Sequence, residues 1–474
     1  AADMDEETPL LRNRSTPPES KIKNSGLFLA VFAAVLGNFN FGYSLVYPSP
    51  VLPNFQSPDA DPRLKMDTEQ AAWFGSIYSL GAAAGGLGAM LLNDMIGRKL
   101  SIMTSAVPST IGYMLMGGAI NVWMLQVGRF LNGVAGGMTA LCFVHLQVYI
   151  SEISHKKVRG ALGSCPQITA VFGALALYAL GLVVPWRWLA VAGEVPALLM
   201  VFLLAFMPSS PRRLLSLGRE QHAERVLRWL RGSQYDVQSE LLAIQVNRQR
   251  LLQLRTPTYY KPILISVVMR FLQQMTGITP ILVYLEPIFK KTNVPLAPKY
   301  DAAIVGLVRL FSVAMAAFLM DKAGRKALLY TSTCCPCAVP ALTKGVCCFH
   351  CLMMSSAFIW AVSHHIVACL LGYAIGWGPI TWLLMSEVLP LAARGTASGL
   401  CVTVSWVTAF WLTHAFTHMV DIYGLYVPYL LFTVVCVLCL LFNAVCIPET
   451  RKRSLEEIEN YFRTGRNFTI SQAS

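Results

Sequence analysis

The stretch DMIGRK at residues 94–99 recurs as DKAGRK at residues 321–326. A second stretch, SEISHKKVRG at residues 151–160, has a counterpart in SEVLPLAARG at residues 386–395, with Ser-Glu and Arg-Gly at the same interval. Two different motifs, each present twice and in the same order, indicate an internal duplication. We therefore predict two halves of the same architecture, with equivalent loops on the same side of the molecule.

The composition around these motifs is that of a membrane protein. Hydrophobic residues make up 55% of the 474 residues and charged residues only 13%, against roughly a quarter in a soluble domain. The net charge of +13 comes from Lys and Arg in short clusters between apolar runs, which is typical of a topology signal. This composition argues against a soluble enzyme, and we expect no nucleic-acid partner.

Twelve apolar runs approach the length of about 20 residues that a membrane-spanning helix needs. Most Lys and Arg lie in the tails and in the loops on one side, so the positive-inside rule predicts that both termini are cytosolic. The fold class is an all-α membrane protein of two six-helix halves. The predicted spans are residues 27–47, 71–92, 100–119, 122–150, 161–184, 188–207, 262–289, 302–320, 327–341, 353–389, 397–420 and 427–447.

These spans divide the chain into five parts. Between the two halves lies a polar, Arg-rich segment with helical spacing, which predicts an amphipathic insert outside the membrane. The parts are a cytosolic tail at 1–26, a six-helix half at 27–207, a cytosolic helical insert at 208–261, a second six-helix half at 262–447 and a cytosolic tail at 448–474.

The repeated motifs also carry paired charges. A Gly after a helix allows a tight turn, and the Arg and the carboxylates around it are suited to bidentate pairing. A single motif of this kind would be a topology anchor, whereas two duplicated motifs favour a gate that stabilises one of two states. The predicted gating residues are Asp94, Arg98, Glu152, Arg159, Asp321, Arg325, Glu387 and Arg394.

Motifs along nearly the whole chain resemble those of the facilitative hexose transporters, which are sugar porters of the major facilitator superfamily. They run from FGY at 41–43, through both repeats, to PET at 448–450. GWGPITW at 376–382 and PWRW at 185–188 look most like the intracellular, class III branch. The resemblance implies the twelve-helix major facilitator fold and uniport of a hexose, glucose or a related sugar, by alternating access. It implies no enzyme activity.

The substrate site can also be approached from chemistry. A hexose needs uncharged hydrogen-bonding groups and an aromatic surface. Amides buried in a span must face a cavity or a partner helix, so a hydrogen bond between helices is the alternative for each Gln. Tyr284 is expected to help close the outer side, and Thr279 and Arg309 stand where many members carry Asn. The resemblance implies as substrate-binding residues Gln167, Gln273, Gln274, Thr279, Tyr284, Arg309, Trp382 and Trp406.

Two alternatives to uniport remain at this stage: a proton-coupled sugar symporter, and a non-transporting sugar sensor on the same fold. The proton-driven relatives carry an Asp directly after the Gly-Tyr pair of the first span, where this chain has Ser44. A hydroxyl does not exchange a proton near neutral pH. Glu194 is the remaining carboxylate within a span, and we interpret it as a packing residue with a hydrogen-bond partner.

No cofactor and no metal ion is expected. His414 and His418 are four residues apart, but two imidazoles with no carboxylate or Cys near them in the sequence make a weak metal site. The stretch 334–351 holds six Cys and a His, and its spacing imitates a zinc site. Its two prolines fall in the predicted ninth span, so we interpret it as a divergent stretch rather than as a metal or disulfide site.

The N-terminal tail carries a candidate sorting signal. Glu6 precedes Leu10 and Leu11 in an otherwise polar segment, a pattern that trafficking adaptors read in cytosolic tails. It predicts an endosomal or lysosomal membrane, with the plasma membrane as the alternative. The predicted partners are thus a small-molecule sugar, the lipid bilayer and trafficking adaptors.

Overall fold

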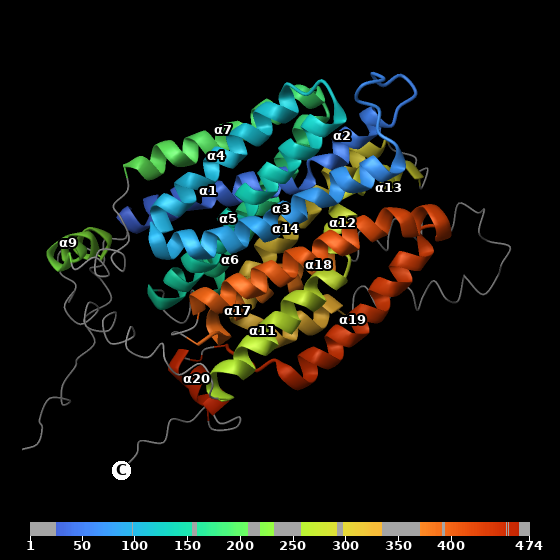
Figure 1. Cartoon of the computed structure of the whole chain (residues 1–474). Coiled ribbons are helices and arrows are strands. Elements are labelled where there is room, and N and C mark those ends of the chain that lie inside the picture. The colour runs from blue at the N-terminus through green and yellow to red at the C-terminus, as the bar shows by residue number, and fades with distance from the viewer. Residues whose placement is uncertain are drawn as a thin grey trace, which may run out of the picture.

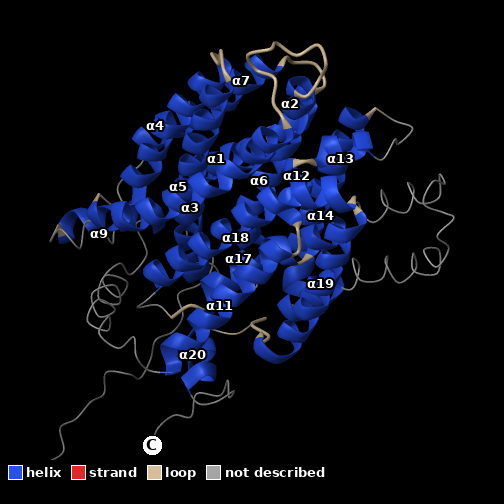
Figure 2. Cartoon of the chain, turned by 45° about the vertical axis from the view of Figure 1, so that its right-hand side comes forward, coloured by secondary structure: helices blue, strands red, loops and turns tan. Residues whose placement is uncertain are grey.

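Every element in the described part of the chain is a helix (Figure 2). The structure is a computed structural model, and the residues that it describes are 25–96, 98–153, 159–206, 219–231, 257–291, 297–333, 370–390, 394–451, 453 and 455–463.

The N-terminal half has one helix for each predicted span and one short extra helix (Figure 1). Its predicted spans all lie on long helices. A helix in lipid pairs its own backbone N–H and C=O groups through hydrogen bonds, and apolar side chains are compatible with the surrounding lipid. The helices are α1 (Ser25–Val46), α2 (Pro48–Phe55), α3 (Thr68–Met95), α4 (Arg98–Gly117), α5 (Val122–Ile153), α6 (Arg159–Gly181) and α7 (Trp186–Ala205).

The described part of the C-terminal half departs from the prediction in two places. The predicted span at 353–389 is interrupted at Gly376, and a new helix begins at Trp377. The predicted single span at 262–289 is three helices, because Gly277 takes a φ of 83° and a second break follows at Tyr284. Residues 325–333 are helical, and the Cys-rich stretch 334–351 lies outside the described residues. The helices are α11 (Pro257–Met275), α12 (Ile278–Val283), α13 (Leu285–Lys291), α14 (Pro298–Ala323), α17 (Trp377–Val388), α18 (Arg394–Tyr423) and α19 (Tyr426–Cys446).

Two further helices lie outside the spans. The amphipathic α9 (Glu220–Arg231) lies in the predicted insert and contacts α1, whereas the last described residues of that insert, 257–261, begin α11. The equally amphipathic α20 (Leu455–Arg463) packs on α11 and α17 (Figure 1). We call the end of the bundle where both GRK motifs lie the inner end, and the opposite end the outer end.

Helices of the described part carry the expected membrane character. Large apolar side chains face outward, with Trp123, Met114 and Phe318 each 70% to 75% exposed. In water such exposed apolar surface would promote aggregation, whereas in a membrane it is in contact with apolar lipid chains. Within the described residues six helices are long and apolar enough to cross a membrane: Thr68–Leu92, Ser164–Gly181, Trp186–Ala205, Pro298–Met320, Gly395–Tyr423 and Val427–Cys446.

Most buried apolar side chains belong to two large clusters with a polar layer between them, and two small clusters lie apart from these. The cluster at the outer end includes Tyr47, Phe74 and Phe416. The cluster at the inner end includes Met385 and Leu389. Helices from both halves contribute to each cluster, and the contacts of α3 with α18 and of α6 with α14 join the halves.

Glycines let α3 and α5 touch backbone to backbone. A Cβ added at Gly85 would collide with the main chain of Val134, and one added at Gly137 would collide with the main chain of Ala82. Gly88, on the same helix as Gly85, has no atom within 4 Å of the equivalent position. Small residues at such a contact allow the close van der Waals packing that holds helices together in lipid.

This difference yields a matched pair of variants. Gly85→Ala should lower the thermal unfolding midpoint, because overpacking a tight contact costs about 1 to 3 kcal/mol. Gly88→Ala should leave the midpoint unchanged. Differential scanning fluorimetry of both purified variants in the same detergent measures the effect, and equal midpoints would contradict the backbone contact between α3 and α5.

Candidate functional site

A central cavity lies in the polar layer between the two clusters. It is lined from the N-terminal half by α1 and α6, and from the C-terminal half by α11, α12, α14, α18 and the helical residues around α17. All of the predicted substrate residues except Tyr284 line it. Its polar and aromatic lining residues are Phe41, Gln167, Arg270, Gln273, Gln274, Thr279, Arg309, Tyr373, Trp382 and Trp406.

Gln274 connects three elements of the cavity wall. Its amide nitrogen donates to the Ser405 hydroxyl at 2.9 Å, and its amide oxygen accepts from the Thr279 hydroxyl at 2.7 Å. The break at Gly277 makes this possible, because it turns α12 away from the axis of α11 and brings Thr279 back toward Gln274. The amide is thus held in one orientation at the cavity surface.

Gln273 uses both ends of its amide group in hydrogen bonds with other residues of the C-terminal half. Its amide nitrogen donates to the Tyr373 hydroxyl at 2.7 Å and to the Trp377 carbonyl oxygen at 2.8 Å. Its amide oxygen accepts from the Arg270 guanidinium. Gln273 lines the cavity, but it also makes the hydrogen bonds between helices that were the alternative interpretation of the sequence.

Arg270 is a cavity residue that we did not predict. Its side chain is 1% exposed, its guanidinium lies 3.8 Å from the ring centroid of Trp382, and its Nη2 donates to the Ser405 hydroxyl at 3.1 Å. The signal in the sequence is an arginine inside an apolar run, one helical turn before Gln273. A charged residue there requires an interior partner.

Three buried donors on cavity-lining residues have no hydrogen-bond partner among the described residues. They are Nε of Arg270, Nε of Arg309 and Nε1 of Trp406. The Trp406 ring is fixed by edge contacts with Phe41 and Tyr78, with ring centroids 5.6 and 6.2 Å away. Since buried donors without partners are unfavourable, a ligand with oxygen acceptors would stabilise this surface.

Tyr284 lies at the outer end, between α12 and α13. Its side chain is 4% exposed, its hydroxyl lies 3.4 Å from the Ala72 carbonyl oxygen of α3, and its ring stacks on Phe416 with centroids 5.9 Å apart. It therefore touches the opposite half above the cavity. Closure of the outer side by Tyr284 stays a prediction.

One of the predicted charge pairs is described at the inner end. Arg325 Nη2 lies 3.4 Å from Glu387 Oε1, and both side chains are at most 3% exposed. Glu387 also accepts from the Thr450 hydroxyl at 2.7 Å, and Gly324 makes the tight turn with a φ of 96°. This pair lies within the C-terminal half. The other six gating side chains lie outside the described ones: Asp94, Arg98, Glu152, Arg159, Asp321 and Arg394.

The residues considered for proton coupling both have hydrogen-bond partners, and none of these partners is a carboxylate. The Ser44 hydroxyl hydrogen-bonds the Tyr113 hydroxyl, and the Ser44 carbonyl oxygen accepts from the buried Arg129 guanidinium. Glu194 accepts from the Thr110 hydroxyl, so it has the hydrogen-bond partner that the packing interpretation predicted. Arg129 is a second buried arginine that we did not predict, and its guanidinium lies 4.7 Å from the Tyr78 ring centroid.

Comparison with solved structures confirms the predicted fold. The proton:xylose symporter XylE bound to 6-bromo-6-deoxy-D-glucose superposes with a TM-score of 0.78 and 23% identity, covering 92% of this chain and 99% of that one. A partially occluded, inward-open structure of XylE from E. coli gives a TM-score of 0.73. At this identity the likeness shows the fold alone, which is the two-half, all-helical fold of the major facilitator superfamily.

Comparison of sequences extends over nearly the whole chain. A family model described as sugar (and other) transporter matches residues 29–462. Solute carrier family 2, facilitated glucose transporter member 6 of Mus musculus is 55% identical over 477 residues, covering 95% of each chain. Member 8 from Bos taurus is 37% identical over 480 residues, covering 97% of this chain and 98% of the relative. With a cavity enclosed between two duplicated halves, the chain belongs to the sugar transporter family and is a multi-pass integral membrane transporter rather than an enzyme.

Proposed function

We propose that the protein carries a hexose across its membrane by facilitated diffusion, alternating between states open to either side. The observation that supports this proposal most is the central cavity, which both halves line and which Tyr284 covers on the outer side. A site between two halves that move against one another is accessible from one side at a time. The names of the relatives, facilitated glucose transporters, point to the same activity.

The cavity suits a neutral polyol. Gln167 and Gln274 supply amides, and the indole of Trp382 supplies a flat surface for the apolar face of a sugar ring. The donors without partners on Arg309 and Trp406 would bind ring or hydroxyl oxygens. The roles of the predicted residues follow: Gln167, Gln274, Arg309, Trp382 and Trp406 contact the sugar. Gln273 and Thr279 position the amide groups, and Tyr284 closes the outer side.

Alternating access requires contacts that break and form at both ends. At the outer end Tyr284 of the C-terminal half packs on α3 of the N-terminal half. At the inner end the Arg325–Glu387 pair lies within one half, so on its own it shapes that half rather than tying the two together. A gate formed by the charged residues of both duplicated motifs stays a prediction, because the side chains of six of the eight predicted gating residues lie outside the described ones.

Uniport is favoured over proton coupling by the surroundings of the candidate groups. At position 44 a hydroxyl replaces the carboxylate of the proton-driven pattern, and the nearby Arg129 bonds a backbone carbonyl oxygen instead of an acid. Glu194 is hydrogen-bonded to Thr110, away from the cavity lining. No group that could take up and release a proton during the cycle lines the cavity among the described residues.

We further propose that the protein resides in an intracellular, endosomal or lysosomal membrane, with both termini in the cytosol. The acidic residue and Leu pair of the N-terminal tail support this, as does the excess of Lys and Arg on the predicted cytosolic side. Glu6, Leu10 and Leu11 lie outside the described residues. The trafficking adaptor that would bind them is part of this proposal.

Substitution of Gln274 tests the cavity. Gln274→Leu should weaken hexose binding by about 2-fold to 10-fold, because each lost hydrogen bond contributes about 0.5 to 1.5 kcal/mol. Thr408→Val is the matched control, since the Thr408 hydroxyl bonds only its own helix, at the Val404 carbonyl oxygen, and does not line the cavity. Binding of a labelled hexose to purified, folded protein measures both. Equal affinity in the wild type and the Gln274 variant would place the site elsewhere.

A proton gradient tests the mode of transport. In liposomes holding the purified protein, an imposed pH gradient should not drive hexose above equilibrium, because the chain lacks a carboxylate at position 44. Glu194→Gln should leave the rate and the final level unchanged. Accumulation against a concentration gradient that Glu194→Gln abolishes would instead make the protein a symporter.

Substitution of both leucines tests the localisation. Leu10→Ala combined with Leu11→Ala should move the protein from internal membranes to the cell surface, because the adaptor surface would lose both apolar side chains. Surface biotinylation and microscopy of tagged protein measure the shift. A double variant that stays intracellular would show that another segment carries the signal.

A further inference from the structure

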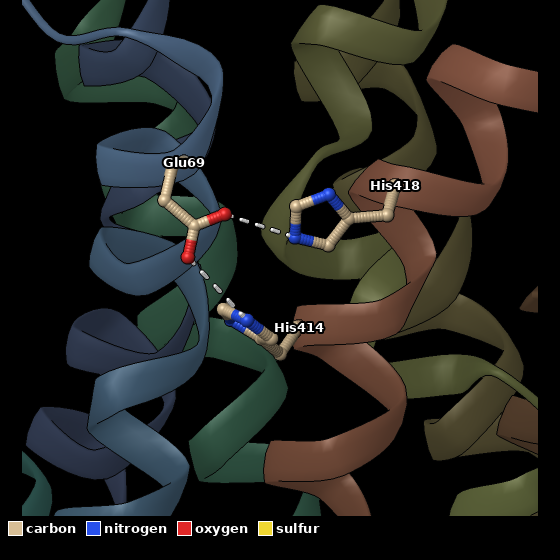
Figure 3. A group of neighbouring side chains, drawn as sticks. All are labelled: Glu69, His414 and His418. Carbon is tan, nitrogen blue, oxygen red and sulfur yellow. Dashed lines mark ion pairs between the residues drawn. The ribbon is translucent and has the colours of Figure 1, made fainter.

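Three side chains that could bind a metal ion meet at the outer end (Figure 3). Glu69 lies in the first turn of α3, and His414 and His418 lie one turn apart on α18. Glu69 Oε2 is 3.2 Å from His418 Nε2, and Glu69 Oε1 is 3.9 Å from His414 Nε2. One ligand atom from each residue lies within 4.8 Å of the other two. The carboxylate that we judged missing from the sequence is thus supplied by the other half.

Neighbouring groups orient two of these side chains. The Trp73 indole donates to Glu69 Oε1 at 2.9 Å and packs beside the His414 ring. The Ser76 hydroxyl donates to the Ala72 carbonyl oxygen at 2.8 Å, so its oxygen is free to accept from His414 Nδ1, 3.4 Å away. A neutral His414 would then carry its lone pair on Nε2, the nitrogen that faces the carboxylate. Such outer contacts are typical of metal-ligating histidines.

With the lone pair of a neutral His414 directed at a carboxylate oxygen 3.9 Å away, a cation between the two atoms would satisfy both. Two imidazoles and a carboxylate are a common ligand set for zinc, with a water completing the tetrahedron. Ligand atoms about 2.0 to 2.2 Å from the metal would lie roughly 3.3 Å apart, which the Glu69–His418 pair already meets. The side chains of Glu69 and His418 are 56% and 41% exposed, so an ion could enter from the outer side.

We propose that Glu69, His414 and His418 bind a divalent transition-metal ion of the zinc type, and that the bound ion holds the outer end closed. The ion would tie α3 to α18 beside the contact that Tyr284 makes with Ala72 and Phe416. Zinc bound at the outer end would therefore slow transport, and we call this effect the brake. The closing effect rests on the proposed alternating-access function, whereas the binding does not.

Zinc titration of the purified protein tests the binding. The protein should be free of affinity tags and treated with a thiol-blocking reagent, so that cysteines cannot contribute. Isothermal titration calorimetry should show one saturable site, whose affinity falls at least tenfold in Glu69→Gln and in His418→Asn. Asp421→Asn is the matched control: this carboxylate lies one turn further along α18 and pairs with Lys291 at 2.9 Å, and its loss should leave zinc binding unchanged.

The closing effect is measured separately. Micromolar zinc that reaches the outer end of the protein in liposomes should slow hexose exchange by the wild type at least threefold. A chelator should restore the rate. Exchange by Glu69→Gln and by His418→Asn should not respond to zinc. Equal zinc affinity in the wild type and the two variants, or no saturable binding, would overturn the site. Equal inhibition of wild type and variants would overturn the brake, and absence of all exchange would count against the proposed transport while leaving the calorimetry valid.

Discussion

The structure depends on one constraint: a polar group within the bilayer must find its partner inside the protein. The backbone meets this by forming helices throughout the described part of the chain. The side chains meet it by facing inward, where Arg129 bonds the Ser44 carbonyl oxygen, Arg270 bonds Ser405, and Arg325 pairs with Glu387. Because these groups cannot face lipid, they gather in the layers between helices, and the central cavity arises where that layer is widest.

The same constraint explains why the two halves pack against each other instead of forming two separate helical bundles. Each half supplies groups that only the other can satisfy or cover: Tyr284 reaches α3, and the cavity needs walls from both. The contacts within a half are tight, as the backbone contact at Gly85 shows. A contact between the halves is made by the neutral Tyr284 hydroxyl at the Ala72 carbonyl oxygen, and it can separate without leaving a buried charge unpaired.

The cavity combines neutral amides with buried guanidinium groups. Arg270 lies against the face of Trp382 and bonds Gln273, so its charge is partly satisfied by a ring and an amide oxygen. Arg270 and Arg309 each keep an Nε without a partner among the described residues. Two guanidinium groups make the cavity wall rich in donors, which favours ligands with many oxygen acceptors.

The sequence by itself determined the membrane class, the duplicated halves, the family and most of the cavity lining, because apolar runs and repeated motifs are local signals. Gln274, Trp382 and Trp406 could be predicted because their motifs resemble those of the hexose transporters, and all three line the cavity. The tertiary structure alone decided the break that divides residues 262–289, the placement of Arg270 on Trp382, and the meeting of Glu69 with His414 and His418. Those contacts join residues far apart in the chain, and only the packing of one half on the other sets their distance.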